Sequence, residues 1–278
     1  MSTRGFRQVD VFTAVATLGN PVAVVHDAEG LSDEQMQAFA RWTNLSETTF
    51  LLAPEHPDAH YRLRIFTPAR ELPFAGHPTL GSAHAWLEAG GRAGADGTVV
   101  QECGVGLVRL RATDGRLAFA APPLIREGAV EPGTAAQVVA GLGIDAADVL
   151  EMAWADNGPG WVGVRLASAE QVLALTPSIR DLPVDVGVIG PHADDAECDV
   201  EVRAFVPHAA GIGEDPVTGS LNASLAQWLA GRVLPSSYVA AQGTVLGRRG
   251  RVHIDTDDDG VIWVGGDTLS TVVGTVTL

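Results

Sequence analysis

The feature of this sequence that most constrains its fold is an internal repeat. The second half of the chain carries motifs of the first half in the same order, and 136 residues separate Ser32 from Ser168 while 142 separate Trp86 from Trp228. The matched segments are Gly19-Asn20-Pro21 with Asn157-Gly158-Pro159, 32–35 with 168–171, 64–68 with 203–207, 78–82 with 216–220, and 86–90 with 228–231. Matches in a constant order indicate a duplicated unit. We therefore predict two similar domains, residues 1–123 and 124–278, with a last strand near 270–278 that can pair back with the first domain.

Local patterns predict that each domain mixes strands and helices. Residues 61–66 alternate polar and apolar side chains, which is typical of a half-buried strand. Ser32 and Gln35 have the spacing of a capping box and predict a helix that continues through Ala40. We therefore expect an α+β protein with several strands wrapped around helices in each domain.

One stretch of the second half, residues 213–229, combines a polar loop with a predicted helix. Leu221, Leu225 and Trp228 recur at helical spacing, which predicts an amphipathic helix. Asp215 and Ser220 then lie near its N-terminus, where free N–H groups and the helix dipole attract anions. The stretch predicts a site for a small anionic substrate, and an ordinary capped helix is the alternative.

Charge and composition exclude several classes of function. The formal net charge is −16, which argues against nucleic-acid binding because that binding depends on basic contacts to phosphates. No apolar run approaches the roughly 18 residues that a membrane helix needs, and no signal-peptide core follows the N-terminus. Neither standard nucleotide-binding glycine loop is present. We expect a cytoplasmic protein that binds a small metabolite.

Two residues of the first half could move protons. Glu47 lies in a polar patch before an apolar strand, where apolar neighbours can raise the pKa of a carboxyl toward the working pH of a general base. His77 lies at a predicted helix N-terminus, which favours the neutral ring. A capping glutamate and a structural histidine are the alternatives.

The sequence gives no sign of a metal site or of a disulfide framework. His56 and His60 are four residues apart, but Pro57 interrupts any helix that would bring them to one face. Cys103 and Cys198 are the two cysteines and form no paired motif. We expect no metal.

Taken together, several motifs are similar to those of a known family. They are 9–12 with Gly19-Asn20-Pro21, then 44–48, 64–68, 76–79 and 211–220, and they span both halves in order. On these segments the chain resembles the phenazine-biosynthesis isomerase-like (PhzF-like) proteins, which have the diaminopimelate epimerase-like fold. The resemblance implies two pseudo-symmetric domains, each a barrel-like curved sheet around a central helix, with the active site between them. It also implies a homodimer without a cofactor.

The resemblance also implies roles for individual residues. Glu47 would move a proton on a cyclic amino-acid-like substrate, trans-2,3-dihydro-3-hydroxyanthranilate. His77 and Asp215 would orient the substrate or relay protons. The remaining residues that the family motifs place at the substrate are Ser46, Gly76, Thr218, Gly219 and Ser220.

The chain departs from the amino-acid racemases and epimerases of this fold, which carry a cysteine at each of two helix N-termini. Here those positions hold His77-Pro78 and Asp215-Pro216, so a relay between two thiols is not expected. We predict a cofactor-independent isomerase. An epimerase or hydro-lyase on the same fold and a non-catalytic binding protein remain alternatives, and a nucleotide-dependent oxidoreductase is disfavoured by the missing glycine loops.

Overall fold

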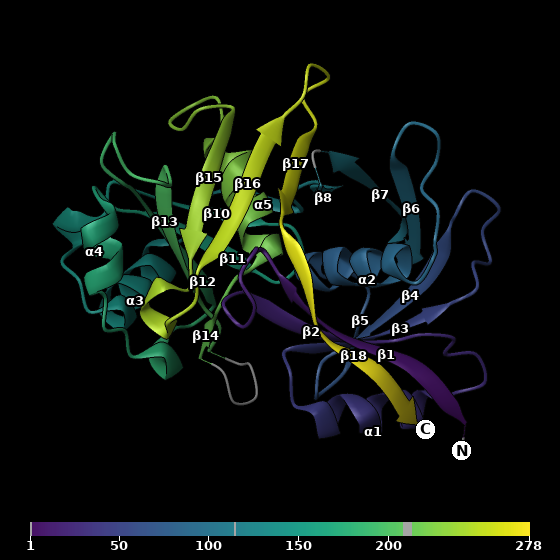
Figure 1. Cartoon of the computed structure of the whole chain (residues 1–278). Helices are drawn as coiled ribbons and strands as arrows, with labels where there is room; N and C mark the ends of the chain where they lie inside the picture. Colours follow the sequence, from purple (N-terminus) through teal and green to yellow (C-terminus); the bar gives the residue numbers. More distant parts are fainter. Residues whose placement is uncertain (1, 114, 208–212) are drawn as a thin grey trace. The chain divides into compact units, whose positions relative to one another are not determined.

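The computed structural model describes residues 2–113, 115–207 and 213–278 (Figure 1). Gly211 and Ile212 of the last family motif lie outside the described residues. The chain divides into two compact units, Met1–Ala120 with Gly265–Leu278, and Ala121–Val264. None of the described helices is long and apolar enough to cross a membrane.

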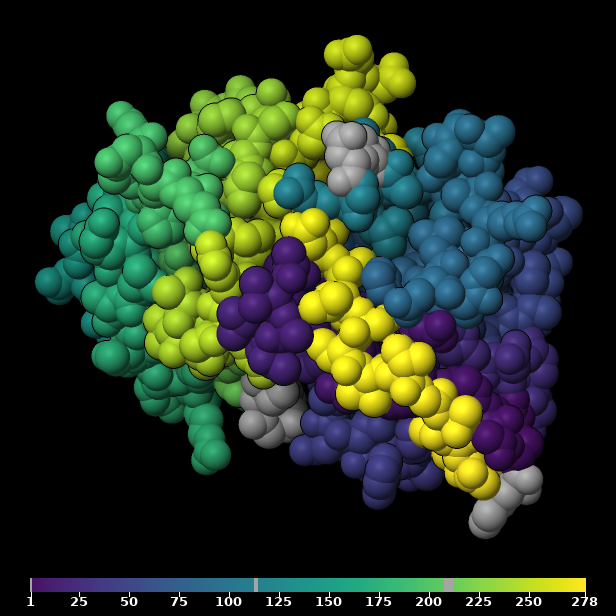
Figure 2. Space-filling model, viewed as in Figure 1, coloured from purple at the N-terminus to yellow at the C-terminus, as the bar shows by residue number. Residues whose placement is uncertain are grey.

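The first unit contains two helices and a mixed sheet. Its elements are β1 (Thr3–Val11), β2 (Asn20–Val25), α1 (Asp33–Thr43), β3 (Glu47–Leu52), β4 (Tyr61–Phe66), β5 (Glu71–Leu72), α2 (Gly76–Glu88), β6 (Thr98–Cys103), β7 (Gly106–Thr113), β8 (Arg116–Ala120) and β18 (Thr268–Thr277). The strands run in the order β18-β1-β2-β3-β4-β6-β7-β8, and the short β5 also pairs with β4. The C-terminal strand β18 pairs antiparallel with β1 from Thr3↔Thr277 to Val11↔Thr268 and is exposed on the face shown in Figure 2.

Helix α2 is the central helix of the first unit. Nine of its 13 residues are buried, and it contacts β1, β2, β3 and β8. Helix α1 is the outer helix, and its Phe39 packs on Phe50 of β3, which in turn packs on Phe66 of β4. The predicted capping box is confirmed, because Ser32 accepts from the Gln35 N–H and Gln35 accepts from the Ser32 N–H.

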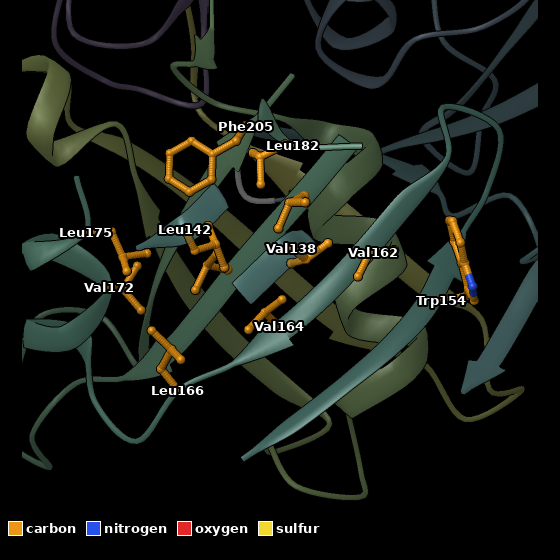
Figure 3. Packing of buried hydrophobic residues seen from close by; sticks show 12 residues of the cluster. Val138, Leu142, Trp154, Val162, Val164, Leu166, Val172, Leu175, Leu182 and Phe205 are labelled. Carbon is orange, nitrogen blue, oxygen red and sulfur yellow. The ribbon is translucent and has the colours of Figure 1, made fainter. Parts of the chain in front are cut away.

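The second unit is built in a similar way. Its elements are β9 (Arg126–Ala129), α3 (Pro132–Leu142), β10 (Glu151–Asp156), β11 (Trp161–Arg165), α4 (Ala169–Ala174), β12 (Asp185–Pro191), β13 (Val200–Phe205), β14 (Glu214–Asp215), α5 (Gly219–Leu229), β15 (Ser237–Gln242), β16 (Gly250–Thr256) and β17 (Ile262–Gly266). The last two residues of β17 belong to the first unit. Short 3₁₀ turns lie at Ala146–Asp148, Ile179–Asp181 and Thr244–Leu246. Figure 3 shows the buried hydrophobic cluster of this unit, to which α3 contributes Val138, β11 contributes Val164 and β13 contributes Phe205.

The two units share one internal topology. The first runs β1, β2, β3, β4, β6, β7 and the second runs β10, β11, β12, β13, β15, β16, and in both the successive pairings are antiparallel, parallel, antiparallel, parallel and antiparallel. An arginine on the corresponding strand of each unit, β4 and β13, forms an ion pair with a glutamate. Arg64 binds both carboxylate oxygens of Glu71 at 2.7 and 2.6 Å, and Arg203 binds both of Glu214 at 2.8 Å. The unit is therefore duplicated in its ion pairs as well as in its strands.

The structure corrects two details of the sequence interpretation. Pro78 is the third residue of α2, whereas Pro216 lies three residues before α5, so the match of 78–82 with 216–220 is displaced relative to the helix starts by about one and a half helical turns. Helix α5 is also not amphipathic, because eight of its 11 residues are buried, including Asn222 and Ser224. A helix enclosed by its own sheet has no solvent face, and its buried polar side chains then mark positions within the core.

Candidate functional site

Glu47 and His77 come together at the N-terminus of α2. Glu47 is the first residue of β3 and enters the sheet opposite Val22 of β2. His77 is the second residue of α2. The Nε2 atom of His77 lies 3.3 Å from Oε2 of Glu47, within ion-pair distance although not in hydrogen-bond geometry, and the side chains are only 6% and 15% exposed. The parallel pairing of β2 with β3 thus delivers the carboxylate to the helix.

Asn20 fixes the proton on the imidazole of His77. The side-chain nitrogen of Asn20, the first residue of β2, lies 3.4 Å from Nδ1 of His77. With the NH₂ group of Asn20 toward the ring, as it lies here, the amide donates and Nδ1 accepts. In this tautomer the proton of the neutral ring lies on Nε2, the nitrogen that is 3.3 Å from Oε2 of Glu47.

His77 is held in its neutral form. Burial lowers the pKa of its imidazole from 6.5 to about 3. The ring is therefore uncharged at neutral pH, as the sequence predicted, although burial and not the helix dipole is the cause that the structure identifies. His77 can therefore donate from Nε2 without being a cation.

The first turns of α2 and α5 lack a side-chain cap. The N-cap residues are Ala75 and Thr218, and neither side chain bonds to the helix N–H groups. In α1 and α4, Ser32 and Ser168 make such bonds, whereas α3, like α2 and α5, begins without one, at Glu131. Uncapped N–H groups at a helix N-terminus suit a carboxylate or another anion.

A second polar cluster lies at the N-terminus of α5. The Thr218 hydroxyl donates to Oδ2 of Asp215 at 2.5 Å. Gln242 at the end of β15 donates to the Asp215 carbonyl and to Oγ1 of Thr218, and its own oxygen accepts from the Thr218 N–H and from Asn222. These hydrogen bonds of Thr218 and Gln242 orient the Asp215 carboxylate and fix where α5 begins.

The remaining predicted residues lie near one or the other helix start. Ser220 accepts from Nε1 of Trp161 at 3.3 Å through its hydroxyl and from Asn157 through its carbonyl. Gly76 and Gly219 are the first residues of α2 and α5, and both are buried. Ser46 is half-buried directly before Glu47. Each unit therefore gathers its own predicted residues around one helix N-terminus.

Sequence reasoning missed two residues that orient these groups. The sequence analysis gives Asn20 no role beyond the Gly19-Asn20-Pro21 motif, although the recurrence of this motif in the second half is a signal that its side chain matters. Gln242 carried no signal, because its role depends on β15 lying beside β13, far away in the sequence.

The cysteines and an open groove lie away from these clusters. Cys103 ends β6 and Cys198 precedes β13, neither lies at the start of α2 or α5, and burial raises the pKa of both thiols. Among the described residues, no three His, Cys, Asp or Glu side chains are gathered as metal ligands. A groove of about 490 Å³ beside β4 is lined by Arg62 and Arg64, both already paired with carboxylates.

Comparison with known proteins gives a consistent picture. The family model described as phenazine biosynthesis-like protein (PhzC-PhzF) matches residues 9–271. The chain is 35% identical to antisense-enhancing sequence 1 of Schizosaccharomyces pombe over 99% of both chains. It is 36% identical to trans-2,3-dihydro-3-hydroxyanthranilate isomerase of Pseudomonas aeruginosa over 91% of this chain and 90% of that protein. A PhzF-family structure from Enterococcus faecalis covers all of both chains with a TM-score of 0.82 and 26% identity.

Proposed function

Because the chain belongs to the phenazine biosynthesis-like (PhzF-like) family of isomerases, we propose that it moves a proton on a small carboxylate of the trans-2,3-dihydro-3-hydroxyanthranilate type without a cofactor. The observation that best supports this proposal is the 3.3 Å approach of Glu47 to a neutral, N–H-bearing His77 in a buried setting. A carboxylate beside a neutral donor can accept and return a proton without passing through a charged histidine.

In the proposed reaction, Glu47 takes a proton from an activated carbon of the substrate. The C–H bond breaks, its electron pair enters the conjugated system, and the proton moves to the carboxylate. Glu47 then delivers this proton to another carbon, where an electron pair of the conjugated system forms the new C–H bond, so the reaction has no net gain or loss of protons. When the substrate binds, the Nε2–H of His77 would form a shorter hydrogen bond, either to Glu47 or to the substrate. Catalytic hydrogen bonds are often long in the free enzyme and shorten in the complex.

Substrate binding is the proposed role of the residues at the helix starts. The uncapped N–H groups beginning at Gly76 and Gly219 suit the substrate carboxylate. Asp215, oriented by Thr218 and Gln242, suits an amino or hydroxyl group. Ser46 and Ser220 would add hydrogen bonds. A homodimer, which the family resemblance implies, and a cytoplasmic location, which the sequence patterns favour, are further parts of the proposal.

The direct test is Glu47→Gln assayed with trans-2,3-dihydro-3-hydroxyanthranilate. Loss of the base should lower kcat by about 10²- to 10⁴-fold, with an unchanged circular dichroism spectrum. Glu34→Gln is the matched control. Glu34 is exposed in the first turn of α1, so this substitution should leave kcat unchanged. Full activity of Glu47→Gln would rule out this base.

The same assay in D₂O separates the isomerase from the main alternative. An isomerase should place deuterium at a carbon other than the one that loses its proton. Deuterium at the same carbon, with inversion, would identify an epimerase.

A further inference from the structure

A short chain of hydroxyl hydrogen bonds from α1 holds the start of β3. The hydroxyl oxygens of Thr43, the last residue of α1, and Thr48, the second residue of β3, lie 2.7 Å apart. The Thr43 hydroxyl donates to the carbonyl of Ala40 at 3.0 Å. Because a hydroxyl has one proton and two acceptor sites, Thr48 is the donor to Thr43 in this arrangement. The two hydroxyls thus tie β3 to the C-terminal turn of α1.

This tie spans the turn that leads to Glu47. Asn44 ends α1 in the left-handed conformation, at φ 54°, and its N–H bonds to the same Ala40 carbonyl at 3.3 Å. The chain then enters β3 at Glu47, and Thr48 follows directly as a fully buried residue. A shift of Thr48 would therefore also shift the carboxylate that precedes it.

A hydrogen bond also holds β3 on its other face. Alternate residues of a strand share one face. Thr49 is on the face toward α2, because its hydroxyl oxygen lies 2.9 Å from that of Ser82 in this helix. Glu47, two residues before Thr49, is on the same face and approaches His77, whereas Thr48 is on the face toward α1. Both faces of the strand are thus fixed next to the carboxylate.

The second unit shows that this fold does not need the Thr48 hydroxyl. Val186 of β12 has the position of Thr48, because Thr48 pairs with Phe66 of β4 and Val186 pairs with Phe205 of β13. Thr48 and Val186 are both fully buried. A valine, which has a similar shape, therefore suffices to pack this strand position. The hydroxyl is present in the unit that carries Glu47.

We propose that Thr48 is a positioning residue for Glu47, and that its hydrogen bond to Thr43 holds the start of β3 so that the carboxylate faces His77. Without the Thr48 hydroxyl, the turn between α1 and β3 loses this anchor and Glu47 is displaced. A displacement of about 1 Å at a reacting group can lower a rate by about 10²-fold. The effect on turnover rests on the proposed function, whereas the positioning of Glu47 does not.

The first test uses the free protein and needs no substrate. In ¹H–¹⁵N spectra of the imidazole rings, the Nε2 resonance of His77, assigned with His77→Gln, should move when Glu47→Gln replaces the facing carboxylate. Thr48→Val should move it in the same direction, and Thr48→Ser, which keeps a hydroxyl, should leave it near the parent position. A His77 resonance that Thr48→Val leaves in place would overturn the proposal.

Thr271→Val is the matched control for these spectra. It also removes a strand hydroxyl, one that donates to the Gln8 carbonyl. Thr271 lies on β18, which β1 and β2 separate from β3, so the His77 resonance should stay in place. An equal movement in Thr271→Val and Thr48→Val would show a general effect of lost hydroxyls and would contradict the proposal.

Turnover of trans-2,3-dihydro-3-hydroxyanthranilate gives a second measurement. Thr48→Val should lower kcat by about 10- to 10²-fold while KM changes little, because the base and not the substrate is displaced. Thr43→Val should act in the same way, and the double variant should lose no more than either single variant, since all three remove one interaction. Additive losses, or a change in KM alone, would contradict the positioning role. If Glu47→Gln keeps full activity, the proposed base is wrong, and the His77 spectra still decide whether Thr48 positions Glu47.

Discussion

At the scale of single residues, the tautomer of the neutral His77 ring depends on Asn20, the partner of Nδ1. Asn20→Asp replaces a donor by an acceptor, so Nδ1 would take the proton and Nε2 would present a lone pair to the Glu47 carboxylate. We expect kcat to fall by about 10²-fold or more, because the proton lies on the wrong nitrogen. Asn20→Ala, which removes the donor without reversing it, should lose less, and a smaller loss in Asn20→Asp than in Asn20→Ala would refute this tautomer.

The buried His77 also predicts how stability depends on pH. Its folded pKa of about 3 lies below the unfolded value of 6.5, so its full contribution is present above pH 6.5 and is lost as pH falls toward 3. The free energy of unfolding should decline by up to about 1.4 kcal/mol per pH unit in this window. His77→Gln should flatten that slope in urea titrations, whereas His56→Gln, at an exposed loop position, should leave it unchanged.

At the scale of elements, the close packing of α5 on its sheet rests on Gly187. A methyl group there would meet Leu221 at 2.1 Å. We expect Gly187→Ala to destabilise the chain by about 1–3 kcal/mol, the usual cost of overpacking a core. Gly133→Ala on α3, where the added methyl meets nothing within 4 Å, should be neutral or stabilising by about 0.5–1 kcal/mol. Urea midpoints of the two variants would show whether close approach or glycine itself matters.

The elements also show what a sequence can and cannot predict here. The capping box at Ser32 and the strand Tyr61–Phe66 were predicted because their determinants are local. The α+β class and the PhzF-like relationship were predicted from motifs and are confirmed by the comparisons. The burial of Asn222 and the hydrogen bonds of Gln242 at the start of α5 were missed, since both depend on strands that are far apart in the sequence but pair in the sheet. The roles of Glu47, His77 and Asp215 in turnover stay predictions.

At the scale of the whole molecule, the first unit is closed by the last residues of the chain. Ser2 and Leu278 exchange backbone hydrogen bonds of 2.6 and 3.1 Å, and β18 covers the length of β1 (Figure 1). Deleting residues 268–278 should expose the edge of β1 and unfold the first unit. Limited proteolysis should then cut within residues 2–120 and spare residues 121–264.

A circular permutant is the matched control for that deletion. Joining Leu278 to Met1 by a short glycine-serine linker, with new ends between Ala120 and Ala121, keeps β18 beside β1 and makes the first unit continuous in sequence. We expect this permutant to fold and to resist proteolysis like the parent chain. Resistance of the deleted chain would show that β18 is dispensable.

The return of β18 has a consequence for how the protein is made. A ribosome synthesises all of residues 121–264 before it reaches the strand that borders β1, so the unit containing Glu47 and His77 can be completed only after the second unit has been synthesised. Until then the nascent chain displays the open edge of β1, the kind of surface that recruits chaperones or pairs with neighbouring chains. The order of folding is thus the reverse of the order of translation, because the unit whose synthesis begins first is the last to complete its fold.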